Sequence, residues 1–218
     1  MEWNIVHRTI CNSQMLASIA LNGLLIPSER KIKVPKKIKD LNRKLKNSPI
    51  NYELITSINK FYDNLKPKHL PERSNSIYGA INLEEKLDET DLLFEDIVTY
   101  IKINFKKFAY VSDQNLGGLI FNLHQSEINL LTEKKLPLDL LKSTEKYALE
   151  YWSRVISLEE FEKNYRFHPL ERLSNNSWIK REESTNKKLP KYFLYPEIIF
   201  PESIPRKYID IIHSNIIN

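Results

Sequence analysis

Ile5-Val6-His7-Arg8-Thr9 lies near the start of the chain, inside the run Trp3 to Arg8, where apolar and polar residues alternate as in a half-buried strand. The segment Asn12 to Asn22 then has the apolar spacing of an amphipathic helix, and Gly23 is a typical helix stop. Burying an unpaired polar side chain costs on the order of a few kcal/mol. His7 is therefore either a functional group or a structurally hydrogen-bonded histidine.

A second stretch, Tyr195-Pro196-Glu197-Ile198-Ile199-Phe200-Pro201, places one carboxylate inside apolar sequence near the other end of the chain. Its pattern predicts a strand over Phe193 to Phe200. Glu197 is either a working carboxylate or a residue that faces solvent on an alternating strand.

The remaining segments mix helices and strands, which predicts an α+β fold rather than a doubly wound parallel sheet. Ser157 and Glu160 form a capping-box pattern at the start of one of the helices. Further helices are predicted between Pro35 and Pro49 and over Tyr52–Leu65, Leu83–Lys102, Pro137–Tyr151, Ser157–Asn164 and Pro205–Ile212. Further strands are predicted over Arg73–Ile81 and Phe108–Val111, and a polar, mobile loop over Leu170–Pro190.

Composition favours a single domain over residues 1–218, because 41% of the 218 residues are hydrophobic and can form one large core. The lone Cys11 cannot form an intramolecular disulfide, which points to a reducing compartment. No apolar run approaches the roughly 20 residues that span a bilayer. We therefore expect a soluble, cytoplasmic protein, or one delivered to a host cytoplasm, without a membrane partner.

The net charge of +5 is concentrated between Arg30 and Lys46. Such a basic segment attracts polyanions, although it is also typical of a solvated helix face. It supports one alternative function, a non-catalytic module that binds nucleic acid or protein through residues 30–46.

Several common site motifs are missing from the sequence. Gly117-Gly118 is followed by neither the third glycine nor the Lys-Ser/Thr pair of a phosphate loop. There is no His-Glu-x-x-His and no Gly-x-Ser-x-Gly, so neither a zinc site nor an α/β-hydrolase elbow is expected.

Three short motifs, which together cover about a fifth of the chain, resemble the ADP-ribosyltransferase fold in its toxin-like, histidine-tyrosine-glutamate branch. His7-Arg8-Thr9 with the later Gly23-Leu24 is similar to the family's first strand, helix and Gly-Leu turn. Arg73 to Ile81 contains Ser76-Ile77-Tyr78, similar to the family's Ser-x-Tyr strand. The stretch around Glu197 resembles the strand that bears the catalytic glutamate. The resemblance implies a split β-sheet core with helical insertions at about 30–66 and 83–103.

The resemblance also implies roles in the use of NAD as co-substrate. Glu197 would be catalytic, because a carboxylate stabilises the positive charge that develops on ribose when nicotinamide leaves. His7 would bind the adenosine ribose, Tyr78 would stack on nicotinamide with Ser76 beside it, and Thr9 would bind the cofactor's amide or phosphates. Arg8 or Arg73 would pair with the pyrophosphate.

The family carries a target-recognition loop just before the glutamate, at about 173–194 here, so Trp178, Tyr192 and Tyr195 are candidates for acceptor contacts. Because Tyr195 stands where arginine-modifying members have a second glutamate, modification of arginine is not expected. The predicted function is a mono-ADP-ribosyltransferase, a toxin, effector or phage-conflict protein that modifies protein or nucleic acid and is controlled by a neutralising antitoxin or regulator. A third alternative, an RNA phosphate transferase on the same fold, would need more basic residues near the cofactor phosphates.

Overall fold

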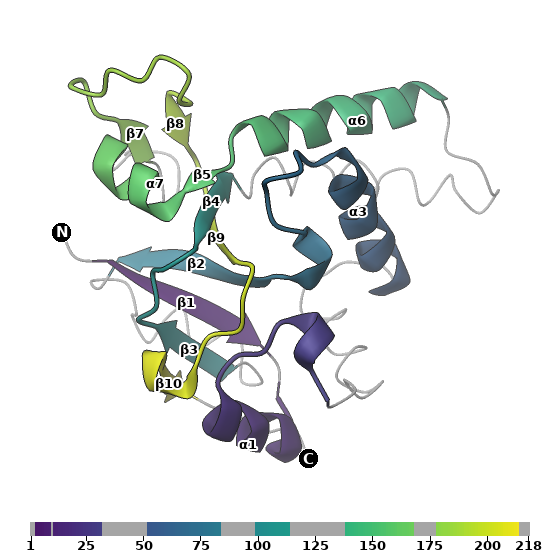
Figure 1. Cartoon of the computed structure of the whole chain (residues 1–218), viewed down its shortest axis with the longest axis vertical. Helices are drawn as coiled ribbons and strands as arrows, with labels where there is room; N and C mark the ends of the chain where they lie inside the picture. Colours follow the sequence, from purple (N-terminus) through teal and green to yellow (C-terminus); the bar gives the residue numbers. More distant parts are fainter. Residues whose placement is uncertain are drawn as a thin grey trace.

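The computed structural model describes residues 3–9, 11–31, 52–83, 99–113, 138–167 and 178–213, and in these ranges the chain forms two antiparallel sheets and four α-helices (Figure 1). The strands are β1 (Trp3–Thr9), β2 (Ile77–Leu83), β3 (Thr99–Ile103), β4 (Tyr110–Asp113), β5 (Ile156–Ser157), β6 (Tyr165–Phe167), β7 (Trp178–Lys180), β8 (Tyr192–Phe193), β9 (Pro196–Phe200) and β10 (Ile209–His213). The α-helices are α1 (Ser13–Asn22), α3 (Tyr52–Leu65), α6 (Leu138–Ser153) and α7 (Leu158–Asn164). Short 3-10 turns are η1 (Pro27–Glu29), η2 (Arg73–Asn75) and η4 (Arg206–Tyr208).

The larger sheet has seven strands in the order β10-β3-β1-β2-β9-β4-β5, and each neighbouring pair is antiparallel. The first and last described strands, β1 and β10, therefore belong to one sheet and both pair with β3, while β1 and β9 both pair with β2. This arrangement confirms the α+β class that the order of segments predicted.

The sheet opens between β1 and β2. Their pairing runs from Trp3 opposite Leu83 to Val6 opposite Ala80. Beyond this point both strands continue, β1 to Thr9 and β2 back to Ile77, with no further ladder pairs between them, and Figure 1 shows them diverging. Both unpaired segments keep their other neighbours, β3 and β9.

One face of this sheet is apolar. Paired residues of neighbouring strands share a face, so Ile5, Ile81 and Ile103 lie together on it. Each is at most 2% exposed, and with the apolar residues of α7 and the small sheet they form the larger core cluster. Gly79 lies on the same face because a Cβ there would approach Ile5 Cγ2 to 2.5 Å.

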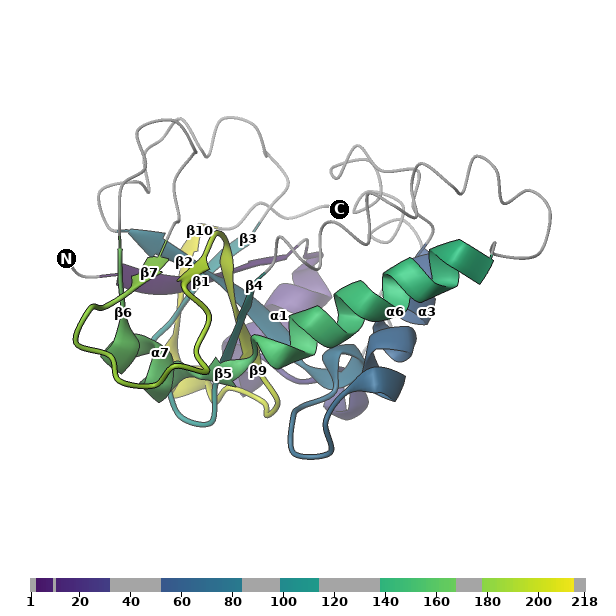
Figure 2. The same ribbon diagram turned by 90° about the horizontal axis from the view of Figure 1, so that it is seen from above.

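The opposite face is covered by α3 and α6, which lie side by side (Figures 1 and 2). Tyr62 from α3, Tyr151 and Trp152 from α6, and Ile199 from β9 form a second buried cluster there. Trp152 Nε1 donates to the Tyr62 carbonyl at 2.8 Å, which ties the two helices together. Unlike the isoleucine-rich face, this face also carries buried polar side chains, among them Ser112 and Arg73.

The smaller sheet has the order β6-β7-β8 and packs with α7 at the end of the larger one. Ser157 Oγ accepts a hydrogen bond from the Glu160 backbone N–H at 3.1 Å, which confirms the predicted N-cap of α7. Phe161 stacks on Tyr165 at 5.1 Å between ring centroids and meets Phe193 edge to face.

Two helix predictions are wrong. A helix was predicted over Leu83–Lys102, within the helical insertion at about 83–103, but the structure shows strand β3 from Thr99 onward. Residues 84–98 lie outside the described ranges. Four of the five β3 residues are buried because the strand lies between β1 and β10, so its sequence carries no alternation. The predicted helix Pro205–Ile212 is the turn η4 followed by edge strand β10.

Four predicted boundaries also change. The strand predicted over Phe108–Val111 is β4, which spans Tyr110–Asp113. Arg73–Asn75 form a 3-10 turn, so the strand predicted from Arg73 begins at Ile77. The strand predicted over Phe193–Phe200 is two strands in different sheets, β8 and β9. Of the loop predicted over Leu170–Pro190, Trp178–Lys180 is strand β7.

Four predicted helices are confirmed, and one of them is α7 at Leu158–Asn164, predicted over Ser157–Asn164. The structure shows α1 and α6 within a few residues of the expected bounds and α3 at Tyr52–Leu65 as predicted. The basic helix expected between Pro35 and Pro49 lies outside the described residues. Among the helices that the structure describes, none combines the length and the apolar character that a membrane span needs.

Candidate functional site

Glu197 lies under the α3 and α6 helices. On β9 it is paired with Ala80 of β2 and with Ser112 of β4, so these three side chains share the polar face of the sheet. Its side chain is 13% exposed, which makes the solvent-facing alternative wrong. Because side chains alternate along a strand, its neighbours Pro196 and Ile198 lie on the apolar face, where both are buried.

The carboxylate of Glu197 is paired with Arg73, 124 residues earlier in the sequence. Arg73 Nη1 donates to Glu197 Oε2 at 3.0 Å, and the arginine side chain is 8% exposed. A buried ion pair of this kind adds little net stability because both charges lose their hydration, whereas removal of one partner is costly. Such pairs are therefore candidates for function.

Three tyrosine rings surround the Arg73 guanidinium. Its Cζ lies 4.8 Å from the ring centroid of Tyr151, 4.9 Å from that of Tyr78 and 5.5 Å from that of Tyr62. Burial alone would lower the pKa of Arg73, but Tyr151, Tyr78 and Glu197 around it raise that pKa well above its usual value. Arg73 therefore stays cationic.

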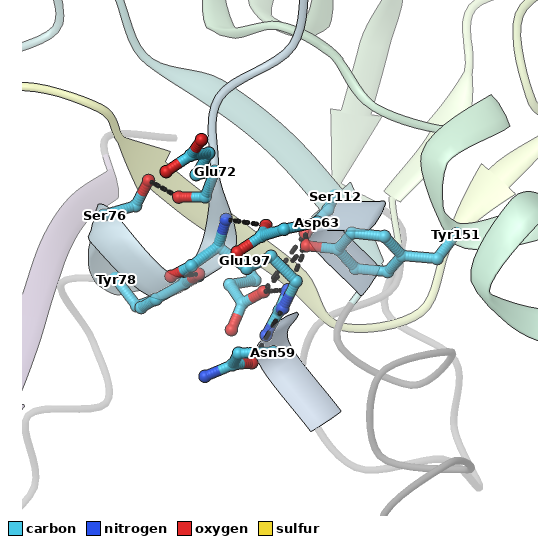
Figure 3. Close-up of polar contacts among 9 residues, drawn as sticks. Asn59, Asp63, Glu72, Ser76, Tyr78, Ser112, Tyr151 and Glu197 are labelled. Atoms are coloured by element: carbon cyan, nitrogen blue, oxygen red, sulfur yellow. Dashed lines mark hydrogen bonds and ion pairs between the residues drawn. The ribbon is translucent and has the colours of Figure 1, made fainter. Parts of the chain in front are cut away.

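The backbone around Arg73 is fixed by Asp63 of α3 and Tyr78 of β2, both labelled in Figure 3. Asp63 accepts hydrogen bonds from the Arg73 N–H at 2.6 Å and from the Ser74 N–H at 3.0 Å. Tyr78 Oη donates to the Arg73 carbonyl at 2.5 Å, and Ser76 Oγ donates to the Glu72 carbonyl at 2.6 Å. The Ser-x-Tyr motif thus holds the turn that presents Arg73 to Glu197.

Arg73 also has a side-chain contact on α3, because its Nε donates to Asn59 Oδ1 at 3.4 Å. The guanidinium is therefore held from both sides, by a helix and by the sheet. Arg73, expected to pair with a pyrophosphate, is directed at Glu197 in this structure.

Ser112 and Tyr151 complete the group around Glu197 (Figure 3). Ser112 Oγ donates to Glu197 Oε2 at 3.2 Å, and Tyr151 Oη lies 2.9 Å from Ser112 Oγ. Arg73 Nη1 donates to Tyr151 Oη. Burial raises the pKa of Tyr151, so its hydroxyl stays protonated and neutral.

His7 lies where β1 leaves β2. Its Nδ1 is 2.6 Å from the Tyr78 carbonyl oxygen, which can only accept, so Nδ1 carries the proton. Burial lowers the pKa of His7, the hydrogen bond to Tyr78 opposes this, and the charge of Arg30 lowers it further. The neutral ring then has its lone pair on Nε2, which is a hydrogen-bond acceptor.

A cleft opens beside His7. Its lining includes Thr9 from β1, Met15 and Ile19 from α1, and the segment from Gly23 to Leu25 with Arg30 and Lys31. Gly23 has φ 84°, and a Cβ there would lie 2.1 Å from the Ile204 carbonyl oxygen, so this turn requires glycine. Leu24 pairs with Ile204 through two backbone hydrogen bonds, which fixes this wall of the cleft.

The remaining predicted residues are placed apart from this group. Arg8 is exposed, with its guanidinium 5.5 Å from the centre of the Tyr100 ring. Trp178 is 5% exposed and packs against Trp3 and Phe161, so it has little surface to offer an acceptor.

Tyr192 and Tyr195 are exposed, by 45% and 37%, just before β9. The guanidinium of Arg154 lies 5.9 Å from the centre of the Tyr192 ring. Both tyrosines are accessible to a macromolecule, in contrast to Trp178. Of the basic segment 30–46, the structure describes only Arg30 and Lys31, which belong to the cleft.

In comparisons with protein-family models, with curated proteins and with solved structures, the chain matches nothing. Its site must therefore be interpreted from its own geometry. Within the described ranges, no cluster of three or more histidine, cysteine, aspartate or glutamate residues could hold a metal ion.

Sequence reasoning missed Ser112, Tyr151, Asp63 and Asn59. The sequence did contain a signal for Ser112, because this polar residue directly follows the apolar strand predicted over Phe108–Val111. Tyr151 had none, since a tyrosine at helical spacing is typical of an ordinary core position.

Proposed function

We propose that this protein is an NAD-dependent mono-ADP-ribosyltransferase with Glu197 as its catalytic residue. The observation that supports it most is the placement of three residues, far apart in the sequence, on neighbouring strands of one sheet. His7, Tyr78 and Glu197 come from the adjacent strands β1, β2 and β9, and the His7 ring is hydrogen-bonded to the Tyr78 backbone. A histidine, a tyrosine and a glutamate of these strands are the groups that the resemblance assigns to NAD.

The chemistry suits a buried carboxylate. The bond between ribose C1′ and nicotinamide breaks, nicotinamide leaves with the bonding electron pair, and positive charge develops on the ribose. Glu197 stabilises this charge from a site where water is largely excluded. The acceptor atom then bonds to C1′ and gives up its proton, which Glu197 can accept as a general base.

NAD would lie across the opening between β1 and β2. His7 and Glu197 are on opposite faces of the pleat, because Glu197 pairs with Ala80 and Ala80 pairs with Val6, the neighbour of His7. A ligand that contacts both would therefore have to extend from one face to the other where β1 and β2 separate. The adenosine half would occupy the cleft, with a ribose hydroxyl donating to His7 Nε2.

The pyrophosphate would meet Arg30 and Lys31, whose side chains line the same cleft. Nicotinamide would then lie beyond the opening, beside the Tyr78 ring. The acceptor is a protein or a nucleic acid that approaches over the exposed Tyr192 and Tyr195.

The test is incubation with NAD labelled in its adenylate group, in separate pools of protein, DNA and RNA. We expect nicotinamide release and transfer of label to one pool, reduced at least about 100-fold in Glu197→Gln. Glu202→Gln, which changes an exposed glutamate five residues away, is the matched control and should retain the wild-type rate. Wild-type turnover by folded Glu197→Gln would contradict the proposal.

A further inference from the structure

The two oxygens of Glu197 have different surroundings. Oε2 lies 3.0 Å from Arg73 Nη1, 3.2 Å from Ser112 Oγ and 3.4 Å from Tyr151 Oη. For Oε1, no hydrogen bond or ion pair is found with any residue that the structure describes, and Figure 3 shows this oxygen directed away from the others. Among the described residues, one oxygen is therefore anchored by three side chains, and the other is held by none of them.

The protons of this network can all be assigned. Arg73 Nη1 has two hydrogens, one for Tyr151 Oη and one for Glu197 Oε2. The single proton of Tyr151 goes to its nearer acceptor, Ser112 Oγ at 2.9 Å, rather than to Oε2 at 3.4 Å. Ser112 then donates its own proton to Oε2. The result is a closed ring of hydrogen bonds. Arg73 and Ser112 donate to the carboxylate directly, and Tyr151 donates to Ser112.

The ring is shielded from water. Tyr151 and Ser112 are both 0% exposed, and Tyr151 reaches the site from α6 through the cluster that α6 forms with α3. Hydrogen bonds in such surroundings are stronger than in water, and networks of them specify a single geometry. The position of Glu197 Oε2 is thus set by a helix, by β4 and by the turn before β2.

We propose that Tyr151 is a positioning residue which, with Ser112 and Arg73, fixes Glu197 Oε2 and so leaves Oε1 as the oxygen that acts on the ribose. This inference rests on the proposed function for the role of Oε1. The network itself does not depend on that function.

The kinetic test compares Tyr151→Phe and Ser112→Ala with wild type. We expect each to lower kcat for nicotinamide release about 10- to 100-fold, with KM for NAD unchanged, because misplacement of a reacting group affects the chemical step. The double variant should lose no more than about the worse single variant, since both belong to one ring.

Tyr165→Phe is the matched control, because it also removes one tyrosine hydroxyl from a nearly fully buried ring. Tyr165 Oη donates to the Pro190 carbonyl at 2.6 Å, in the small sheet and away from Glu197. It should lower the unfolding midpoint without changing kcat of the folded protein. If Tyr151→Phe behaves like Tyr165→Phe, Tyr151 is merely structural and the proposal is wrong.

A second measurement needs no activity. In a double-mutant cycle of Tyr151→Phe with Glu197→Gln, followed by the urea midpoint of unfolding, the two shifts should be non-additive. Additive shifts would mean that the two side chains are not coupled and would overturn the network. If folded wild-type protein releases no nicotinamide from NAD, the proposed function and the role of Oε1 both fail, while the cycle still decides whether the network exists.

Discussion

The two faces of the seven-stranded sheet carry different kinds of buried side chains. On one face, isoleucines such as Ile5, Ile81 and Ile103 pack with almost no exposed surface. On the other, the ion pair of Arg73 and Glu197 lies under two helices among tyrosine rings. The same strands supply both faces, so the difference comes from alternate residues. Apolar burial stabilises the fold, whereas a buried ion pair contributes little net stability. This difference supports our proposal that the polar face carries the chemistry.

The largest expected effect comes from breaking the ion pair on one side only. Glu197→Leu leaves the Arg73 guanidinium buried without its carboxylate and should lower the free energy of unfolding by about 3–5 kcal/mol. The double variant Arg73→Met with Glu197→Leu removes both charges and should regain most of that loss. Urea denaturation of the three proteins measures this. A double variant less stable than Glu197→Leu alone would show that the pair is kept for stability.

A loss of stability of similar size is expected when apolar contacts are removed on the other face. Ile103→Ala should lower the free energy of unfolding by about 2–5 kcal/mol because it leaves a cavity at a position that is 2% exposed. Ile103→Val, as the conservative partner, should cost about 0.5–1.5 kcal/mol. NAD turnover per folded molecule should stay at the wild-type level in both, and a selective loss of turnover would mean that the two faces are not independent.

The smallest expected effect is a pH dependence of the free energy of unfolding that comes from His7, where β1 separates from β2. Because the pKa of His7 is lowered by folding from about 6.5, the unfolded chain binds more protons just below that pH. The stability that neutral His7 provides is complete above pH 6.5 and is lost as pH falls toward the folded pKa. His7→Gln should flatten the plot of unfolding free energy against pH in this window.

The control for that experiment is His69→Gln, at an exposed position that is not among the residues lining the cleft. It should reproduce the wild-type slope. An unchanged slope in His7→Gln would mean that His7 is not held neutral in the folded protein.

Sequence patterns correctly predicted the elements that depend on neighbouring residues, namely amphipathic helices and a helix cap. The helix α3 has the bounds that its apolar spacing gives, and α7 begins at the serine that caps it. Strands β3 and β10 were mistaken for helices because burial of β3 on both sides removes its alternation, and because β10 takes its structure from pairing with β3. Such pairing between distant segments cannot be seen in a local window.

The site shows the same limit. Glu197 and His7 could be selected because each is polar within apolar strand sequence. Arg73 was selected only for another role, as a pyrophosphate ligand. Its pairing with Glu197 could not be predicted, since the two residues lie 124 positions apart and are brought together only by the order of the strands. Tyr151 depends in addition on how α6 packs over the sheet, which no spacing rule encodes.

The most direct test of the account is calorimetric titration of the non-cleaving Glu197→Gln protein with NAD and with ADP-ribose, which lacks nicotinamide. We predict that both ligands bind, that His7→Ala in this background weakens both, and that Tyr78→Ala weakens NAD while leaving ADP-ribose nearly unchanged. Failure of the folded protein to bind either ligand would contradict the claim that the opening between β1 and β2 is an NAD site.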